Sequence, residues 1–491
     1  MLIDLNLLSS PPRELKPDIC VCGGGPAGIV LALELAKRRP DWHIVLLEGG
    51  GTSVATERER LLYDVGVGEK PYAVAASRRR MLGGTSAHWG GWSKPLDPED
   101  FTAPAAWSVP DWPITPEDLQ PFLAAAHLWC EIPSDRYAAA EVRSRQPQRF
   151  LDLPEDGPVA ERLFRFSPPT RFGTRYLDTL TAQPNLDCYL HANLCGLEQR
   201  GERIVSASAK SLDGRPLRIA AKRFVLTQGG LETTRTLLNL RGEASDDGIG
   251  LRSPHLGRHF ADHYGVRPGS VLAPAELGYR RIADEGTAVM PVLAPSPASL
   301  SDSEQQNVCM MLEPAPGAGA LPDRYSSHAA LGFSARAHWN YRAQMIVEPR
   351  PHPDSRITLT DARCELGLRR ARLDWKIHPE DVTSALRFFE QFSRLLAQTG
   401  QGRTRLTYQP SAAQLAAAMG ANHHLGTLRF ARDPKDGVAD ADGRIHDLDN
   451  LHVISSALFP RYGYSNPTLT LVALAVRLAS RWAGSTPEQN A

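Results

Sequence analysis

The 491-residue chain has few cysteines, no excess of either charge and no long apolar run. Its seven cysteines form no C-x-x-C pair, no C-x-x-C-H haem-attachment motif and no cluster with iron–sulfur spacing. We therefore expect neither a redox cysteine pair nor a metal centre. An odd number of scattered cysteines is typical of buried thiols in a reducing compartment.

Charge and hydropathy argue against two further classes of protein. Lys plus Arg and Asp plus Glu both number 55, and the run Arg78–Arg80 is too short to make a polyanion-binding surface, so we expect no nucleic-acid partner. Asp4 interrupts the N-terminal apolar residues, and Arg477 interrupts Leu469–Ala479, the best candidate for a membrane span. These features predict no signal peptide, no membrane segment and a cytoplasmic protein.

A βαβ unit is predicted over residues 18–48. Its parts are a strand at Asp18–Cys22, a turn at Gly23–Gly28, a helix at Ile29–Arg38 and a second strand at Ile44–Leu47. A glycine-rich turn between a strand and a helix is the usual binding element for a dinucleotide pyrophosphate, because the helix N-terminus offers free N–H groups.

Each glycine of this turn has a separate task. Gly23 makes the turn, Gly25 lets the backbone approach a pyrophosphate, and Gly28 lets the helix pack closely against the strand. Glu48 lies 20 residues beyond Gly28, where a carboxylate accepts hydrogen bonds from an adenosine ribose. The unit therefore predicts a bound dinucleotide.

Only one such fingerprint is present, since Gly317-Ala318-Gly319 lacks the flanking strand and helix. An enzyme that passes electrons from NADPH to a flavin usually needs a second nucleotide fold. If the dinucleotide is FAD, we therefore expect the substrate itself to reduce it.

Farther along the chain, residues 186–226 alternate in short strand-like runs, and Phe224–Glu232 repeats a strand–glycine–helix junction. A one-sided apolar pattern predicts a helix over residues 379–398. A second helix is predicted at Ser411–Met419, with Gly420 as its C-terminal stop.

A second glycine-rich loop, Met81–Gly91, surrounds His88 with glycines and small hydroxyls. One interpretation is a purely structural loop with a buried, hydrogen-bonded His88. The other is a loop whose glycines let the backbone approach a flat ring, with His88 able to attack a flavin methyl group and form a covalent link. The residues alone leave both open.

Two boxes near the C-terminus carry the candidate catalytic groups. His423-His424-Leu425-Gly426-Thr427 is followed 43 positions later by Asn466-Pro467-Thr468-Leu469-Thr470. Asn466 and Pro467 are favoured as the N-cap and first residue of a helix over Leu469–Trp482, and a lone histidine is usually a satisfied core residue. A neutral histidine can also take a hydroxyl proton, and a helix N-terminus can stabilise negative charge on a flavin.

Taken together, these motifs resemble the glucose–methanol–choline (GMC) family of FAD oxidoreductases, over nearly the whole chain. Further motifs that carry the resemblance are Gly229–Arg235, Gly257–His263 and Pro353–Arg356. The resemblance implies that His423, not His424, is the catalytic base and that Asn466 is its partner. It also implies these cofactor-binding residues: Gly23, Gly25, Gly28, Glu48, Gly83, Gly84, Thr85, His88, Leu194, Gly229, Pro467 and Thr468.

Asn466 and the S-x-H-W element at Ser86–Trp89 are closest to the pyranose-oxidase-like and bacterial sugar or glycoside dehydrogenase branch. The resemblance implies oxidation of a hydroxyl on a sugar, glycoside, amino sugar or related polyol, with hydride transfer to flavin N5. The electron acceptor, oxygen or a quinone or other acceptor, stays open. The alternatives are a lyase on the same scaffold and a non-catalytic FAD-binding subunit.

The expected fold is α/β, with a Rossmann-like FAD-binding domain and a discontinuous α+β substrate domain built on an antiparallel sheet. We expect FAD binding by residues 1–95, 186–265 and 421–491, and substrate binding by residues 266–420. Residues 96–185 are expected to form a connector and a lid-like part of the substrate domain.

Overall fold

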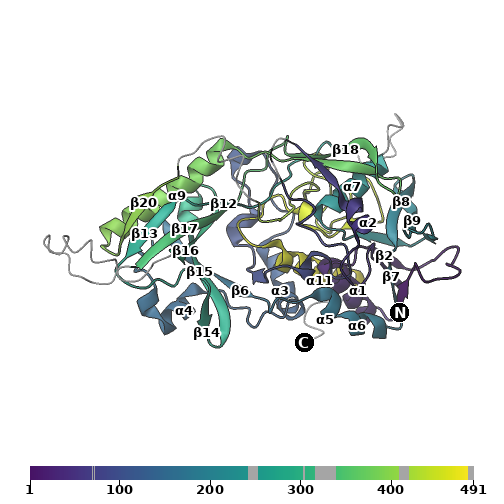
Figure 1. The fold of residues 1–491 in the computed structure, drawn as a ribbon, viewed down its shortest axis with the longest axis horizontal. Coiled ribbons are helices and arrows are strands. Elements are labelled where there is room, and N and C mark those ends of the chain that lie inside the picture. Colours follow the sequence, from purple (N-terminus) through teal and green to yellow (C-terminus); the bar gives the residue numbers. More distant parts are fainter. Residues whose placement is uncertain are drawn as a thin grey trace.

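A computed structural model describes residues 1–68, 70, 72–241, 253–301, 305–315, 339–408 and 420–484. The predicted helix at Ser411–Met419, the Gly317–Gly319 motif and the last residues lie outside these ranges. Figure 1 shows two lobes side by side, one containing β2, β7 and α1 and the other containing β13, β17 and α9.

The first lobe is built on a six-stranded parallel sheet, as a dinucleotide-binding fold requires. Its strands, in spatial order, are β1 (Leu2–Asp4), β7 (Leu186–Leu190), β3 (Ile44–Leu47), β2 (Ile19–Cys22), β11 (Arg223–Leu226) and β21 (Leu451–Val453). The central strands are buried on both faces, which explains their continuous apolar sequences.

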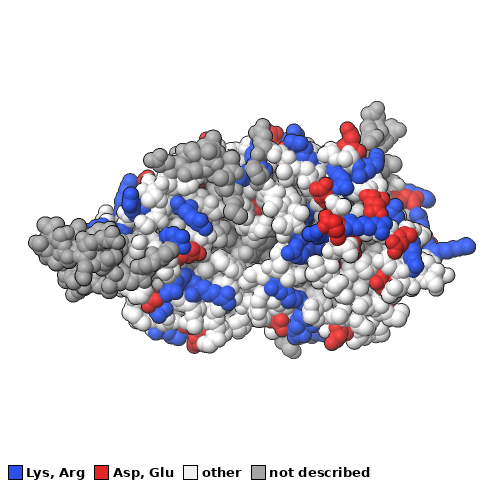
Figure 2. Space-filling view, in the orientation of Figure 1, with Lys and Arg blue, Asp and Glu red and all other residues white. Residues whose placement is uncertain are grey.

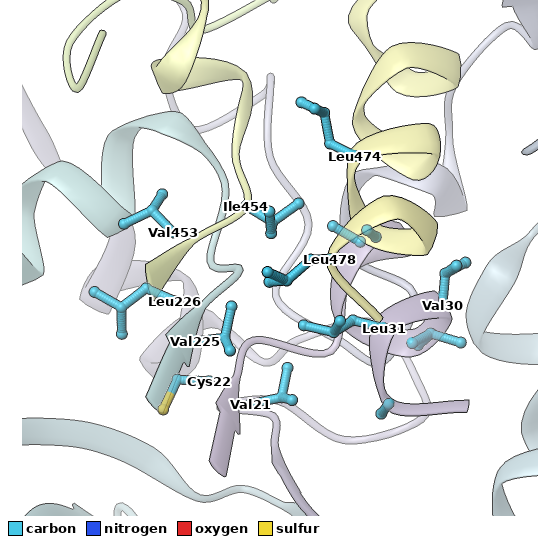
Figure 3. Packing of buried hydrophobic residues seen from close by; sticks show 14 of the residues in the cluster. Val21, Cys22, Val30, Leu31, Val225, Leu226, Val453, Ile454, Leu474 and Leu478 are labelled. Atoms are coloured by element: carbon cyan, nitrogen blue, oxygen red, sulfur yellow. The ribbon is translucent and has the colours of Figure 1, made fainter. Parts of the chain in front are cut away.

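Two long helices cover this sheet, α1 (Pro26–Arg38) and α11 (Pro467–Ala483). Figure 3 shows Val30 and Leu31 of α1 and Leu474 and Leu478 of α11 packed beside side chains of β2, β11 and the end of β21. Burial of these branched side chains joins N-terminal and C-terminal segments in one core. The other helices of this lobe are α3 (Pro116–Trp129), α5 (Phe172–Arg175), α6 (Leu177–Ala182) and α7 (Gly230–Arg241).

The second lobe is built on a nine-stranded antiparallel sheet. Its main path is β20 (Arg403–Leu406), β13 (Gly269–Ala273), β17 (Trp339–Val347), β16 (Val308–Pro314), β15 (Thr287–Pro295), β6 (Val159–Phe166) and β5 (Trp92–Ser93). Two further strands pair with β17 and β15: β12 (Tyr264–Val266) and β14 (Ile282–Asp284). Helix α9 (Pro379–Gln398) packs its apolar face on this sheet, and α4 (Ala139–Arg145) lies beside β6.

Two three-stranded sheets complete the first lobe. One contains β10 (Pro216–Ile219), β9 (Arg203–Lys210) and β8 (Asn193–Arg200). The other contains β18 (Arg356–Arg363), β19 (Arg369–Asp374) and β4 (Val65–Val67). The short helices α2 (Glu57–Arg60) and α8 (Pro297–Leu300) lie on connections.

The predicted α/β fold, with a Rossmann-like part and an antiparallel sheet, is confirmed. The helix over residues 379–398 has the predicted bounds. The first helix begins at Pro26, not at Ile29, because Gly25 has an extended backbone and acts as N-cap with proline at the first helical position. The strands β5 and β6 come from residues before 186, so the antiparallel sheet extends beyond residues 266–420.

Lys and Arg side chains are interspersed with Asp and Glu side chains over the face drawn in Figure 2. Among the described residues, no helix has the length and hydropathy needed to cross a bilayer. The same residues contain no group of three or more His, Cys, Asp or Glu side chains that could hold a metal ion.

Candidate FAD and catalytic site

The first glycine loop has the geometry that its sequence predicted. Gly23 has a φ of +120°, and a Cβ there would lie 2.7 Å from the Thr227 backbone. A Cβ on Gly28 would lie 1.9 Å from the Gly23 oxygen, so helix and turn are in close contact. At Gly25, in contrast, the nearest atom to an added Cβ is 3.9 Å away. This open position at the N-terminus of α1 is suited to a ligand's phosphate groups.

Glu48 lies at the end of β3 and is buried. Its Oε2 accepts a hydrogen bond from the Gly24 N–H at 2.9 Å, and its Oε1 accepts one from the Gly50 N–H at 2.7 Å. These bonds hold the carboxylate beside the cavity, and each oxygen retains a lone pair for a ribose hydroxyl.

The second glycine loop packs directly on the first, since the Gly83 N–H donates to the Gly24 oxygen at 2.7 Å. Gly83 and Gly84 both have positive φ angles, 89° and 51°, which favour glycine. A short 3₁₀ helix at Gly84–Ala87 follows, and it places Thr85 and His88 at the cavity wall. The His88 side chain is exposed, in contrast to the interpretation of His88 as a buried, hydrogen-bonded residue of a structural loop.

One cavity of about 510 Å³ joins these loops to the C-terminal boxes. All predicted site residues line it except Gly28 and Gly83, which pack behind it. Its wall therefore combines β8, through Leu194, with the loop at Gly229 and the start of α11 at Pro467 and Thr468. The cavity brings together segments that are more than 400 residues apart.

Positive charge and unpaired polar atoms also lie at this cavity. Arg78, Arg79 and Arg80 line it, and Arg78 Nη1 lies 3.3 Å from Glu232. The buried atoms Arg78 Nε, Arg80 Nε and Asn193 Oδ1 have no hydrogen-bond partner among the described residues. Buried polar atoms without partners are costly, so a polar ligand explains them. Glycine loops, helix N-terminus, carboxylate and arginines together fit a bound dinucleotide.

His423 is held at the cavity by three interactions. Its backbone N–H donates to Asp262 at 2.8 Å, its Nδ1 lies 2.8 Å from Nδ1 of His263, and its Nε2 lies 3.1 Å from Nδ2 of Asn466. Burial, with the neighbouring His263 and His424, holds the pKa of His423 well below the ordinary value. The ring is therefore neutral at neutral pH.

A backbone carbonyl sets which nitrogen of His423 carries the proton. His263 Nε2 lies 2.7 Å from the Gly463 oxygen, so this nitrogen must donate. Burial lowers the pKa of His263 to about 4, so the ring is neutral and its Nδ1 can only accept. His423 must then donate from Nδ1, which leaves a lone pair on Nε2 facing Asn466 and the cavity.

The Asn466 side chain does not serve as a helix cap. Asn466 occupies the N-cap position of α11, as its sequence predicted, but its side chain caps no backbone N–H. Its Nδ2 group donates to His423 Nε2, in agreement with the tautomer set by His263. The N-terminus of α11 is therefore not closed by Asn466, and it lines the cavity at Pro467 and Thr468.

His424 has a structural environment. Its Nε2 lies 3.2 Å from the Ser77 hydroxyl, and it packs against Tyr72 and Phe260. Burial lowers the pKa of His424 to about 3. This agrees with the interpretation of His424 as a hydrogen-bonded core residue.

Two supporting residues were not singled out from the sequence, Asp262 and His263. Both lie in the segment Gly257–His263, which was noted only as a family motif. Burial raises the pKa of Asp262 to about 7, against hydrogen bonds from the Tyr72 hydroxyl and from the N–H groups of His423 and Asn422. Their contacts with His423 span about 160 residues, so local spacing contains no signal for them.

Known proteins resemble this chain in sequence and in fold. Residues 351–475 match the family model described as GMC oxidoreductase. The chain is 27% identical to paromamine 6'-oxidase of Streptomyces fradiae over 63% of this chain and 54% of that protein. It is 24% identical to 2-methyl-1,2-propanediol dehydrogenase of Mycolicibacterium austroafricanum over 94% of each chain. The structure of pyridoxine 4-oxidase from Mesorbium loti matches with a TM-score of 0.54 and 19% identity, over 95% of this chain and 99% of that one.

The fold combines one parallel dinucleotide-binding sheet with one antiparallel sheet, and the lining of the cavity fits a dinucleotide such as FAD. Residues 351–475 match the GMC oxidoreductase family model, and the chain resembles solved GMC oxidoreductase structures over nearly its whole length, as its motifs predicted. The chain spans about half the length of the first curated relatives that it matches.

Proposed function

We propose that this protein oxidises a hydroxyl group of a sugar, glycoside, amino sugar or related polyol to a carbonyl. The observation that carries this proposal is the lone pair of His423 Nε2, which lies beside Asn466 on the cavity formed by the FAD-binding loops. A neutral, buried imidazole with an accepting nitrogen is suited to remove a hydroxyl proton.

The two side chains have distinct tasks in this mechanism. His423 Nε2 takes the hydroxyl proton of the substrate while a hydride leaves the carbon that bears this hydroxyl. Asn466 holds the substrate oxygen through its amide, in place of the bond that it donates to His423 in the free protein. His263 keeps the proton of His423 on Nδ1, so that Nε2 is always the accepting atom.

FAD, when bound, supplies the hydride acceptor at flavin N5. The residues that would hold it are those of the two glycine loops, Glu48, Leu194, Gly229 and the start of α11. The positive end of the 17-residue helix α11 favours negative charge at its N-terminus. A covalent link through His88 stays a prediction, supported by the exposure of this side chain at the cavity wall.

The substrate class is supported by the cavity wall and by the relatives. Ile346 of β17 and Trp92 of β5 line the cavity from the antiparallel sheet, which supports substrate binding between this sheet and the FAD loops. Paromamine 6'-oxidase and the large subunit of fructose dehydrogenase are named for polyhydroxylated compounds, and both are 26–27% identical to this chain. We therefore propose a carbohydrate-like alcohol as the substrate, as for the pyranose-oxidase-like and sugar or glycoside dehydrogenase branch.

Separate parts of the chain would bind FAD and substrate. Residues 1–95, 186–265 and 421–491 would bind FAD, and residues 266–420 would bind substrate, joined by part of residues 96–185. With a single dinucleotide fingerprint, the substrate would reduce FAD, and oxygen or a quinone would reoxidise it.

The direct test is an anaerobic screen of sugars, glycosides and amino sugars for bleaching of the flavin absorbance. We expect at least one compound to bleach the flavin and to yield one equivalent of carbonyl product. Subsequent addition of oxygen or of a quinone identifies the acceptor. If dithionite bleaches the flavin but no alcohol does, the oxidase or dehydrogenase proposal is wrong. Cleavage of a cyanohydrin-type substrate without bleaching would identify the lyase alternative, and no turnover of any kind would favour the non-catalytic subunit.

A further inference from the structure

A second cavity, of about 800 Å³, lies outside the FAD and substrate cavity. Its lining contains six basic side chains and, among the described residues, no Asp or Glu: Arg258, Arg356, Arg369 and Arg429 with His255 and His259. Trp107, Leu238, Ile357 and Leu359 supply apolar wall. We propose that this cavity binds a small molecule bearing an oxyanion, a phosphate or a carboxylate group.

Arg429 is the central observation for this proposal. It is 4% exposed, and no carboxylate of the described residues forms an ion pair with it. Its Nε donates to the Asp436 backbone oxygen and its Nη2 contacts His255, but its Nη1 has no hydrogen-bond partner among the described residues. Burial lowers the pKa of Arg429 to about 10, so it still carries its charge at neutral pH.

Asp436 acts on Arg429 electrostatically but forms no ion pair with it. A buried guanidinium that lacks an ion pair is costly, and an oxyanion is the ligand that best compensates it. The planar fork of arginine matches the paired oxygens of a carboxylate or phosphate. Arg356 and Arg258, both only partly buried, can approach the same ligand from another side of the cavity. Arg258 and Arg369 also form ion pairs, with Asp354 at 3.6 Å and Asp361 at 3.4 Å, so the proposal depends mainly on Arg429.

His259 provides a second, independent observation. It is 7% exposed and lines the cavity, and its Nδ1 has no hydrogen-bond partner among the described residues. Its Nε2 lies 3.4 Å from Nδ1 of His255, whose Nε2 in turn donates to the Lys435 oxygen. Burial, with the neighbouring Arg429, lowers the pKa of His259 to about 3, so the ring is neutral. The free Nδ1 can accept from the hydroxyl of a partly protonated phosphate or of a hydroxycarboxylate.

The same two chain segments serve both cavities. The segment Gly257–His263 places His259 in the second cavity and His263 against His423. The segment 423–429 places His423 at the first cavity and Arg429 at the second. The Gly257 N–H donates to the Thr427 oxygen at 2.9 Å, so the segments are hydrogen-bonded between the two cavities. An anion at Arg429 would therefore bind directly behind the loop that holds His423.

The test is calorimetric titration of the FAD-saturated protein with inorganic phosphate and, separately, with citrate. Sodium chloride at matched ionic strength is the reference titrant. FAD saturation removes the phosphate-binding loops of the first cavity from the measurement. We expect binding of phosphate, citrate or both at one site, and binding by only one of them assigns the ligand to that class.

Two variants and one control locate the site. Arg429→Met removes the buried charge, and Arg356→Gln removes a partly exposed one that the fold tolerates more easily. We expect each variant to lower the affinity for the anion at least tenfold with FAD content unchanged. Arg394→Gln, on the exposed face of α9, should have no effect on this affinity. Absence of binding above the chloride reference, or equal binding by the wild type and Arg356→Gln with FAD retained, overturns the proposal. Because no alcohol is added, this result is independent of the proposed oxidation.

Discussion

At the residue scale, the state of His423 depends on a chain of three hydrogen bonds that ends at a backbone carbonyl. The Gly463 oxygen makes His263 a donor at Nε2 and an acceptor at Nδ1. His423 must therefore carry its proton on Nδ1. The second nitrogen of His423 thereby becomes the accepting atom. A base prepared in this way needs no carboxylate in contact with its ring.

This arrangement predicts an unusual pH profile for flavin reduction. In the proposed mechanism neutral His423 is the active form, and burial holds its pKa well below the ordinary value, so the neutral form persists as the pH falls. We expect the rate of anaerobic flavin reduction at saturating substrate to stay level from about pH 8 to about pH 6. An ordinary histidine would already lose half of the rate near pH 6.5. Stopped-flow measurements with FAD content checked at each pH distinguish these profiles.

His263 is predicted to be a positioning residue. Replacement by Phe keeps the ring volume but removes the acceptor for His423 Nδ1, so the tautomer is no longer set. A positioned general base contributes about a hundredfold to ten-thousandfold, and this variant loses only its orientation. We therefore expect a loss of about tenfold to a hundredfold in the rate of flavin reduction, with FAD retained.

His263→Gln is the informative partner of this variant, since a carboxamide can both accept from His423 and donate to Gly463. We expect it to recover part of the lost rate. His446→Gln is the control, since the Nε2 of His446 lies 3.2 Å from the Ala431 oxygen, away from the cavity. Equal rates for His263→Phe and the wild type would show that His263 does not orient the base.

The sequence predicted some of these residues and not others, for a physical reason. The register of the H-x-x-G-T box selected His423 over His424, and the structure gives the two rings the corresponding different surroundings. Asn466 was predicted as an N-cap, which is right for its backbone but not for its side chain. His263 was missed because its role depends on a contact across 160 positions, which local patterns do not encode.

At the scale of elements, the beginning of α1 is where sequence and structure agree most closely. Strand, glycine turn, helix and acidic residue follow from short-range patterns, because the turn needs glycine for steric reasons that act within a few residues. The pairing of β4 with β19 joins residues more than 300 positions apart, and no local pattern predicted it.

Gly25→Ala separates folding from cofactor binding. An added Cβ meets no protein atom within 3.9 Å, so we expect the apoprotein to lose only about 1 kcal/mol, the cost of a poorer N-cap. The same methyl group occupies the space where the phosphates approach, so FAD affinity should fall at least tenfold. Apoprotein denaturation and FAD titration by fluorescence quenching measure the two effects.

Gly66→Ala is the matched control, since its added Cβ also has no neighbour within 3.9 Å and lies on β4, away from the cavity. We expect it to leave FAD affinity unchanged. Unaltered FAD affinity in Gly25→Ala as well would place the phosphates elsewhere.

At the scale of the whole molecule, a buried ion pair connects the two lobes near the site. Glu348 follows β17 of the antiparallel sheet, and Arg461 precedes α11 of the first lobe, with Arg461 Nη2 at 2.8 Å from the carboxylate. Glu348 also accepts the N–H groups of Tyr462 and Gly463, so it holds the carbonyl that orients His263. This connection could not be predicted from patterns within either segment.

Glu348→Gln tests whether this pair supports the base. Removing one partner of a buried ion pair costs about 3–5 kcal/mol, so we expect the free energy of unfolding to fall by that amount. The rate of flavin reduction should fall with it, because Gly463 is no longer held in place. Glu390→Gln, which breaks an exposed pair on α9, should change the unfolding free energy by less than about 1 kcal/mol. A fully active Glu348→Gln protein would contradict the proposed support of His263.

The role of His423 as the base is tested most directly by anaerobic flavin reduction with substrate in the His423→Ala variant, with His446→Ala as the matched control. We predict that both variants retain FAD and are yellow. The control should bleach at the wild-type rate with the alcohol found in the screen, whereas His423→Ala should bleach at least a hundredfold more slowly. Full bleaching of His423→Ala at the wild-type rate would contradict the assignment of His423 as the base.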